Sequence, residues 1–167
     1  MSREFRRKAG SKGMMPINEH SFLNISDYRT YGFEIIDDES GGHVAFCKYL
    51  AGGGMQDGEG KSIYHMTKWF VLDNADFAFK MRELAPPARE LREGETPIDI
   101  GLGNAVKIAW RNLMVSEGMK PGEMARMMRN SPQTLHRHMC FDKSTGIDVI
   151  EKAFSALGHP LELTVPD

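Results

Sequence analysis

"KPGEMARMMRNSPQTLHRHM", residues 120–139, carries the signals of two short helices joined by a tight turn. Pro121 suits the first position of one helix, and Ser131, followed by a proline, is a good N-cap for the next. Leu135 and Met139 are four residues apart, so they point inward together from the second helix. This stretch predicts a helix-turn-helix unit, and it decides how the C-terminal half of the chain is interpreted.

The opposite face of the second helix suits DNA. Gln133, Thr134 and Arg137 share that face. In a helix-turn-helix the second helix presents its N-terminal polar residues to the major groove, where Gln reads adenine and Arg reads guanine. A plain helical hairpin with a solvated polar face is the alternative interpretation.

The local charge agrees with a nucleic-acid surface, although the whole chain has a net charge of −2. The stretch from 119 to 143 contains five basic residues and only two acidic ones, Glu123 and Asp142. It also contains His136 and His138. A basic patch of this kind is the electrostatic footprint of phosphate binding. Its five cationic residues are Lys120, Arg126, Arg129, Arg137 and Lys143.

The sequence HRHMC also raises the question of a metal. His136 and Cys140 are four residues apart and share a helix face, whereas His138 points away from His136. A structural zinc site takes four ligands, and two do not make one. We therefore expect neither a metal nor a cofactor.

Outside this unit, three further elements are expected in the C-terminal half. Asn104 is a good N-cap and predicts a helix that reaches about Ser116. Another helix is predicted over residues 147–157, before a glycine and a proline. Short apolar segments at 98–103 and 161–165 predict strands that flank the four helices.

The N-terminal half predicts a hairpin followed by a helix. Residues 31–36 and 43–50 are rich in aromatic and β-branched residues and are separated by the turn-rich sequence DDESGG. Residues 62–84 have a broad apolar face without Gly or Pro, which predicts one long helix. Between hairpin and helix, AGGGMQDGEGK predicts a flexible loop, with Ser62 as the helix N-cap.

Two glycine-rich stretches look like nucleotide sites, and both fail on spacing. A phosphate loop ending in Gly60-Lys61-Ser62 needs glycine at position 55, which is Met55. Asp73 follows too soon for the crossover that a parallel strand needs. In GLGNAV, Val106 occupies the place of the third glycine of a dinucleotide fingerprint.

The composition is that of an ordinary globular protein: 167 residues, 41% hydrophobic and 26% charged. Cys47 and Cys140 give no disulfide framework, and a reducing cytoplasm is the simplest setting. No apolar run approaches a membrane span. The basic N-terminus lacks the apolar core of a secretory signal.

The sequence shows no set of nucleophile, general base and orienting residue. The paired carboxylates Asp37-Asp38 sit in a turn, so we expect no enzyme activity.

The expected fold class is α+β with two modules. Residues 1–30 are a flexible basic tail. Residues 31–84 form a small hairpin-plus-helix domain, and the Pro-rich, charged residues 85–97 form a linker. Residues 98–167 form the four-helix domain with its flanking strands, for DNA binding and dimerisation.

The C-terminal half resembles the DNA-binding module of HicB-type antitoxins, a lambda-repressor-like (XRE-type) helix-turn-helix. The resemblance runs without gaps from about residue 119 to 165. It rests on E-x-A-R at 123–126, on the helix of Arg137, and on T-x-I-D leading into A-x-x-A-L-G at 145–158. Residues 31–84 are similar in order to the family's N-terminal domain, a partial ferredoxin-like hairpin, loop and helix, and the resemblance implies that they form the toxin-binding domain.

The resemblance implies a function. Such proteins bind and neutralise a small HicA-type toxin, an mRNA-cleaving ribonuclease, and repress their own operon. The DNA-reading helix of the family corresponds to Ser131–Met139 here, with Gln133, Thr134, His136 and Arg137 as base or phosphate contacts. The alternative is a free-standing lambda-repressor-like regulator, with an N-terminal domain for sensing or oligomerisation.

Two departures from the family pattern stand out. The usual glycine of the inter-helix turn is Arg129, with Asn130 beside it; Asn tolerates the left-handed conformation, so the turn is expected to be kept but shifted. The family's D-x-P-G segment after the second strand is replaced by KYLAGGGMQDGEG, residues 48–60.

We also expect a homodimer, formed through the C-terminal domain. Each of the two predicted flanking strands, 98–103 and 161–165, leaves an unpaired edge. A symmetric partner that extended this ribbon would set two reading helices about one DNA turn apart, roughly 34 Å.

Overall fold

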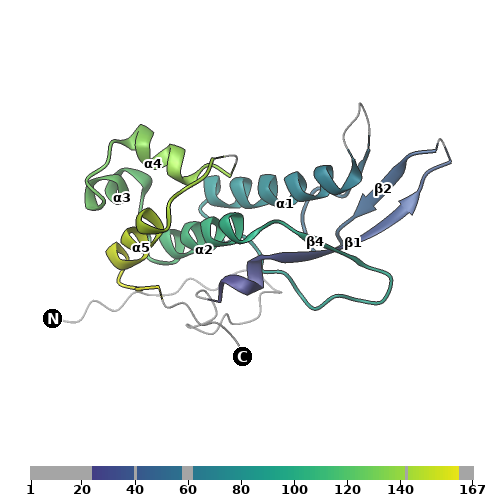
Figure 1. Cartoon of the computed structure of the whole chain (residues 1–167), viewed down its shortest axis with the longest axis horizontal. Helices are drawn as coiled ribbons and strands as arrows, with labels where there is room; N and C mark the ends of the chain where they lie inside the picture. The colour runs from purple at the N-terminus through teal and green to yellow at the C-terminus, as the bar shows by residue number, and fades with distance from the viewer. Residues whose placement is uncertain (1–23, 40, 58–61, 142, 162–167) are drawn as a thin grey trace.

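The structure is a computed structural model that describes residues 24–39, 41–57, 62–141 and 143–161. A four-stranded sheet lies at one end of an elongated molecule, three short helices lie at the other, and two longer helices run between them (Figure 1). The N-terminal elements are η2 (Ile25–Tyr28), β1 (Thr30–Asp37), β2 (His43–Phe46), β3 (Gly54–Gln56) and α1 (Ile63–Lys80). The remaining elements are β4 (Thr96–Asp99), α2 (Leu102–Ser116), α3 (Pro121–Met127), α4 (Pro132–Met139) and α5 (Ile147–Ala156). The mixed α+β class expected from the sequence is confirmed.

The sheet has the order β3-β2-β1-β4, and all its pairs are antiparallel. The predicted hairpin is confirmed, with Glu34 opposite Phe46 and Asp37 opposite His43. Helix α1 covers one face, where Phe70 meets the ring of Phe33 edge-on with centroids 6.2 Å apart.

The glycine-rich segment is partly ordered as a strand, so the expectation of a loop throughout is wrong at Gly54–Gln56. This short strand pairs with the free edge of β2. Gly54 permits it, because a Cβ there would lie 2.5 Å from the ring of Phe46. Residues 58–61 lie outside the described residues. Ser62 is the N-cap of α1, as predicted, and accepts a hydrogen bond from the amide of His65.

The strand predicted at 98–103 is corrected by the structure. It is β4, and it pairs with β1 in the N-terminal sheet, with Tyr31 opposite Ile98, instead of flanking the helices. Strand β4 pairs with the edge of β1 that β2 leaves open, because that register buries Ile98 and Ile100 in the core. The second predicted strand, 161–165, lies outside the described residues from 162 onward. The strand argument for a dimer therefore loses one of its two strands.

Helix α2 begins three residues earlier than predicted. Its N-cap is Gly101, whose positive φ of 87° suits glycine, and not Asn104. Asn104 lies inside the first turn, where its side chain donates to the carbonyl of Ile100 at 2.8 Å. The side chain of Asn104 therefore still bonds a backbone carbonyl near the start of α2, but it does so from inside the helix and not as the N-cap.

The Pro-rich segment 85–97 is held against the rest of the chain. The side-chain amide of Asn112 accepts from the amide of Ala85 at 2.8 Å and donates to its carbonyl at 2.9 Å. The hydroxyl of Tyr31 donates to the carbonyl of Pro86. Ala85 is part of the common hydrophobic core of the sheet and the helices, and Ala88 packs against that core.

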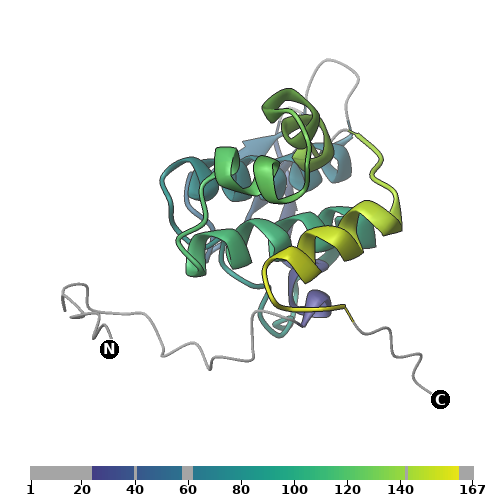
Figure 2. The ribbon, with the colours of Figure 1, turned by 90° about the vertical axis from the view of Figure 1, so that its left-hand side faces the viewer.

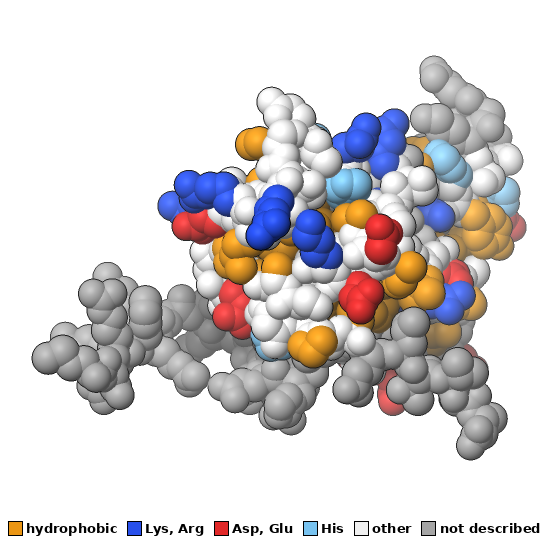
Figure 3. Space-filling model, turned by 60° about the vertical axis from the view of Figure 1, so that its left-hand side comes forward, with side chains coloured by type: hydrophobic (Ala, Val, Ile, Leu, Met, Phe, Trp, Pro, Cys, Tyr) orange, Lys and Arg blue, Asp and Glu red, His pale blue; other side chains and the backbone are white. Residues whose placement is uncertain are grey.

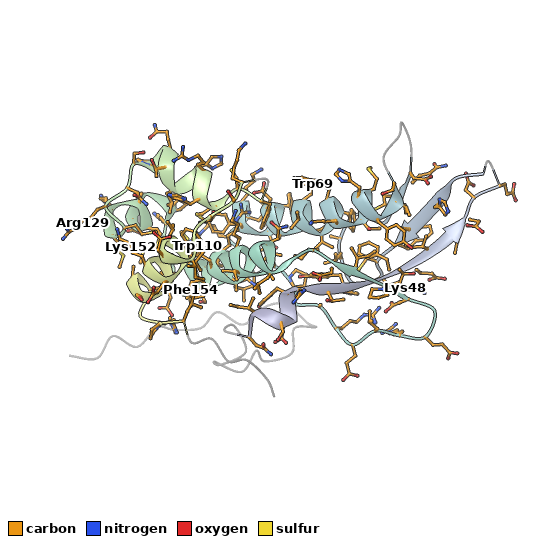
Figure 4. The ribbon with its side chains drawn as sticks, in the orientation of Figure 1. Lys48, Trp69, Trp110, Arg129, Lys152 and Phe154 are labelled. Atoms are coloured by element: carbon orange, nitrogen blue, oxygen red, sulfur yellow. The ribbon has the colours of Figure 1, made fainter. Side chains whose placement is uncertain are left out.

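One hydrophobic core extends from the sheet to the short helices. Phe33 under α1, Ile108 and Trp110 in α2, and Phe154 in α5 are all fully buried. Helix α5 packs against α2 (Figure 2), and Trp110 of α2 and Phe154 of α5, labelled in Figure 4, belong to the same core. No helix among the described residues is both long enough and apolar enough to span a bilayer.

The turn between α3 and α4 is not shifted. Arg129 itself adopts the left-handed conformation, with φ of 55°. The amide of Asn130 donates to the carbonyl of Ala125 and that of Arg129 to Arg126, the bond pair that closes a Schellman motif. Helix α1 ends in the same way at Arg82, with φ of 60°. A residue with a side chain pays a steric cost in this conformation.

We predict that Arg129→Gly stabilises the protein by about 0.5–1 kcal/mol, because glycine adopts the left-handed conformation without strain. Urea unfolding of the full chain measures the change. The matched control is Arg126→Gly, inside α3, which we expect to destabilise by about 1 kcal/mol. Equal losses for both variants would show that Arg129 is not strained.

Candidate nucleic-acid interface

Helices α3 and α4 cross closely with their apolar faces against each other and against the core. Met124 and Ala125 of α3 are buried, as are Leu135 and Met139 of α4. The inward direction predicted for Leu135 and Met139 is confirmed. The remaining face of α4 is open to solvent.

The start of α4 is fixed by its own side chains. Ser131 accepts from the amide of Thr134 at 3.1 Å, and its hydroxyl donates to the Thr134 hydroxyl at 2.9 Å. Pro132 occupies the first helical position, as predicted. Ser131 and Thr134 thus cap the helix, and Thr134 is half-buried. The exposed positions of this first turn belong to Pro132 and Gln133.

The end of α4 is held by side chains from two other segments. Its last carbonyls lack helical partners, as at every helix C-terminus. The carbonyl of His138 accepts from the hydroxyl of Thr145 at 2.8 Å, and that of Met139 accepts from the guanidinium of Arg111 at 2.7 Å. The ammonium of Lys107 donates to the carbonyl of Cys140. Positive charge at this end also complements the helix dipole.

Arg111 is buried between α1, α2 and α4. It pairs with Asp76 of α1 at 2.9 Å and lies over the rings of Phe141 and Phe79, at 4.1 Å and 5.3 Å from their centroids. Burial lowers the pKa of Arg111, against the opposing effect of Asp76. Burial also raises the pKa of Asp76, but hydrogen bonds from Lys80 and Arg111 outweigh this and hold that pKa below its ordinary value.

The lowered pKa of Asp76 makes the stability of the fold depend on pH. Because the folded-state pKa of Asp76 lies below that of the unfolded chain, its contribution is complete above the ordinary carboxylate value of about 4. The contribution is lost as the pH falls through the folded-state pKa. The bridge that joins α1 to α2 is thus intact at neutral pH.

Unpaired cations surround the open face of α4. Lys120, Arg126, Arg129 and Arg137 are exposed, and none makes a salt bridge with another described residue. Figure 4 shows Arg129 projecting from the tip of the molecule, and Figure 3 shows Lys and Arg side chains across the upper part of this end.

The other predicted contact residues lie on or near this face. Gln133 and His136 are exposed on α4. Lys143 is exposed in the loop that follows, and its carbonyl accepts from Lys107. The only acidic side chain in α3 or α4, Glu123, accepts from the amide of Lys120 and so caps α3. The face is therefore polar and positive.

The pair considered for a metal makes a contact of its own. The Sγ atom of Cys140 lies 3.6 Å from Nε2 of His136, across one turn of α4. Among the described residues, no group of three or more His, Cys, Asp or Glu side chains could hold a metal ion.

The sequence analysis overlooked Lys107 and Arg111. They interrupt the apolar sequence AVKIAWRNLM and lie four residues apart, so they share one face of α2. Two cations at that spacing on an otherwise apolar helix were the sequence signal that could have identified them as buried and paired. Lys and Arg are rarely buried unless they are paired, so each had to have a partner elsewhere.

Comparison with known proteins identifies a curated relative. No protein-family profile matches the chain. The chain is similar to Antitoxin HicB 2 of Photorhabdus laumondii, with 29% identity over 143 residues that cover 83% of this chain and 98% of that protein. The alignment spans nearly the whole relative. It supports the resemblance to HicB-type antitoxins drawn from the sequence.

We predict that Arg111→Met lowers the free energy of unfolding by about 2–4 kcal/mol, because it leaves the carbonyl of Met139 without its donor and removes a partner of Asp76. Urea unfolding measures the loss. Lys80→Met is the matched control, since the exposed Lys80 pairs with the same carboxylate at 2.6 Å. We expect it to cost less than about 1 kcal/mol. Equal costs would mean that the carbonyl contact contributes nothing.

Proposed function

We propose that this chain is a cytoplasmic, non-catalytic HicB-type antitoxin, which neutralises a small HicA-type mRNA-cleaving toxin and represses its own operon. The observation that carries the proposal is the similarity to Antitoxin HicB 2 over nearly its full length. The charged, open face of α4 supports the repressor half.

DNA is recognised by α4 as the second helix of a helix-turn-helix. Its N-terminal turn and outer face are free, while its C-terminal end is held by Lys107 and Arg111. A helix fixed at one end keeps its reading residues in a defined position, so less entropy is lost on binding. Pro132 has no amide hydrogen, and the amides of Thr134 and Leu135 donate to Ser131. The amide of Gln133 is therefore the backbone donor that this first turn offers to a phosphate.

The contacts divide by chemistry. Gln133 and Arg137 carry bidentate groups and reach base edges in the major groove. The other side chains of the interface make phosphate contacts, which set affinity and orientation. These phosphate contacts are Lys120, Arg126, Arg129, Ser131, Thr134, His136 and Lys143.

Operator binding is by a homodimer. One α4 helix reads only a short half-site, and helix-turn-helix proteins gain specificity by pairing two half-sites about one DNA turn apart. A two-fold symmetric dimer is the commonest arrangement that does this. The C-terminal half carries the dimer contact, so that the two α4 helices keep a fixed separation.

We predict that Arg137→Ala weakens binding to the upstream DNA of the operon by about 1–3 kcal/mol and relaxes base preference at one position. Gel-shift titration measures both effects, and the shifted complex should contain two chains. Arg92→Ala is the control, because Arg92 is exposed on the loop before β4 at the other end of the molecule. If Arg137→Ala binds like the wild type, Arg137 is not a base contact.

Toxin neutralisation is tested separately. We predict that co-expression of this chain with the small ribonuclease of its operon restores growth, and that the two proteins co-purify, because an antitoxin acts by stoichiometric binding. A chain that binds operator DNA but leaves ribonuclease activity unchanged would instead be a free-standing regulator.

A further inference from the structure

A cavity of about 350 Å³ lies between the first turns of α2, the first turns of α5 and the loop that precedes α5. Its lining residues on the two helices recur at helical spacing: Gly103, Val106 and Lys107 on α2, and Ile147 and Ile150 on α5. Protein interiors contain few voids larger than a water molecule. This volume instead falls within the range of roughly 300–1,000 Å³ that is typical of small-molecule sites.

The walls of the cavity are mostly apolar. Val106 and Ile150 are buried, while Leu102 and Ile147 are 56% and 63% exposed at the opening. A Cβ at Gly103 would meet no atom within 4 Å, so open space reaches the backbone of α2. Exposed apolar side chains that gather at a cavity are typical of a ligand site, because a bound hydrocarbon removes them from water.

One wall of the cavity is polar and carries a cation. Lys107 is 3% exposed and lines the cavity from α2. Ser144 lines it from the loop, and its hydroxyl makes no hydrogen bond with another described residue. A cation among apolar side chains attracts an anion more strongly than it does in water. An ammonium and a hydroxyl are both donors that a carboxylate accepts from.

The same wall holds the end of α4. The ammonium of Lys107 donates to the carbonyls of Cys140 and Lys143. Thr145, which also lines the cavity, donates to the carbonyl of His138 at 2.8 Å. A carboxylate in the cavity competes with these neutral carbonyls for the ammonium of Lys107, and hydrogen bonds between two charged groups are the stronger ones. Occupation of the cavity therefore loosens the C-terminal end of α4.

We propose that this cavity binds a small carboxylic acid with an aliphatic or aromatic body, and that the bound acid weakens operator binding by loosening α4. The effect on DNA rests on the proposed repressor function, whereas binding of the acid does not. The hydrocarbon body lies against Val106, Ile147 and Ile150, and the carboxylate lies at Lys107 and Ser144. Because coupling between two sites is reciprocal, operator DNA weakens binding of the acid by the same factor.

The walls distinguish this cavity from a smaller one beside β1 and the loop before β4. That cavity has a volume of about 140 Å³, and its lining includes Glu34, Glu93 and Glu95. Three carboxylates repel an anion, and polar walls offer little apolar area for burial. A hydrophobic acid therefore selects the cavity between α2 and α5.

The first experiment measures binding of hexanoate and phenylacetate to the full chain by titration calorimetry. Hexanamide and phenylacetamide are the matched ligands, because each keeps the shape of its acid and lacks the charge. We expect at least one acid to bind with a dissociation constant below about 1 mM, which ligands of this size can reach. We expect its amide to bind about 10-fold more weakly.

A variant that fills the cavity locates the site. Gly103→Leu places a side chain in the open space over α2, and leucine is a better helix former than glycine. We expect acid binding at least about 10-fold weaker, with operator binding unchanged in the absence of acid. Gly122→Leu is the matched control in the first turn of α3, where a Cβ also meets nothing within 4 Å. We expect it to bind the acid like the wild type, and thermal unfolding checks that both variants fold.

A second variant tests the charge. In Lys107→Met the ammonium is lost and the apolar stem is kept, so we expect acid and amide to bind with equal affinity. Lys152→Met, which removes an exposed cation from α5, is the control and should keep the preference for the acid. An unchanged preference in Lys107→Met would show that the carboxylate does not lie at Lys107.

Gel-shift titration with saturating acid measures the effect on DNA. We expect operator binding by the wild type to weaken about 5-fold or more, and operator binding by Gly103→Leu to stay unchanged. The amide at the same concentration should have a smaller effect than the acid.

The outcomes separate this inference from the proposed function. If neither acid binds the wild type at millimolar concentration, or if Gly103→Leu binds them equally well, the cavity is not the site and the proposed function stands. If the acid binds in the cavity and the operator affinity does not change, the regulation is overturned. A chain that binds the acid in the cavity but does not bind operator DNA would keep the site and refute the repressor function.

Discussion

The buried side chain of Arg111 is the contact on which the arrangement of the two ends depends. It pairs with Asp76 of α1 and donates to the carbonyl of Met139 at the end of α4. A buried guanidinium without partners is very costly. Neither α1 nor α4 can therefore leave α2 without a large loss of free energy, and the helix proposed to read DNA is fixed relative to the helix that covers the sheet.

That arrangement places opposite charges at opposite ends. The hairpin end is acidic, with the carboxylate of Asp37 95% exposed, and the α3–α4 end carries exposed cations such as Arg137 that make no salt bridge with another described residue. Exposed charges further apart than a Debye length of about 8 Å hardly interact at physiological salt. The acidic end and the basic end therefore present their charges to the solvent independently of each other.

Elements that depend on neighbours in the sequence were predictable. The caps at Ser62 and Ser131 and the helix start at Pro121 are local, since each depends on residues within one turn. The partner of Thr96–Asp99 was not predictable, because a short strand carries no signal for which edge it joins. Pairing with β1 is favoured by burial of Ile98, which only the folded core decides.

The candidate interface divides in the same way. The sequence by itself determined that the 131–139 helix is amphipathic, with Gln133 and Arg137 outward and a basic neighbourhood, because helical periodicity and charge are local properties. Only the tertiary structure decided how that helix is held. Arg111 reaches Met139 across 28 residues. Such a bond cannot be recognised from sequence periodicity, because its acceptor is a backbone carbonyl, which every residue has. The carbonyl of Met139 needs a partner only because it lies at the end of a helix in the folded chain.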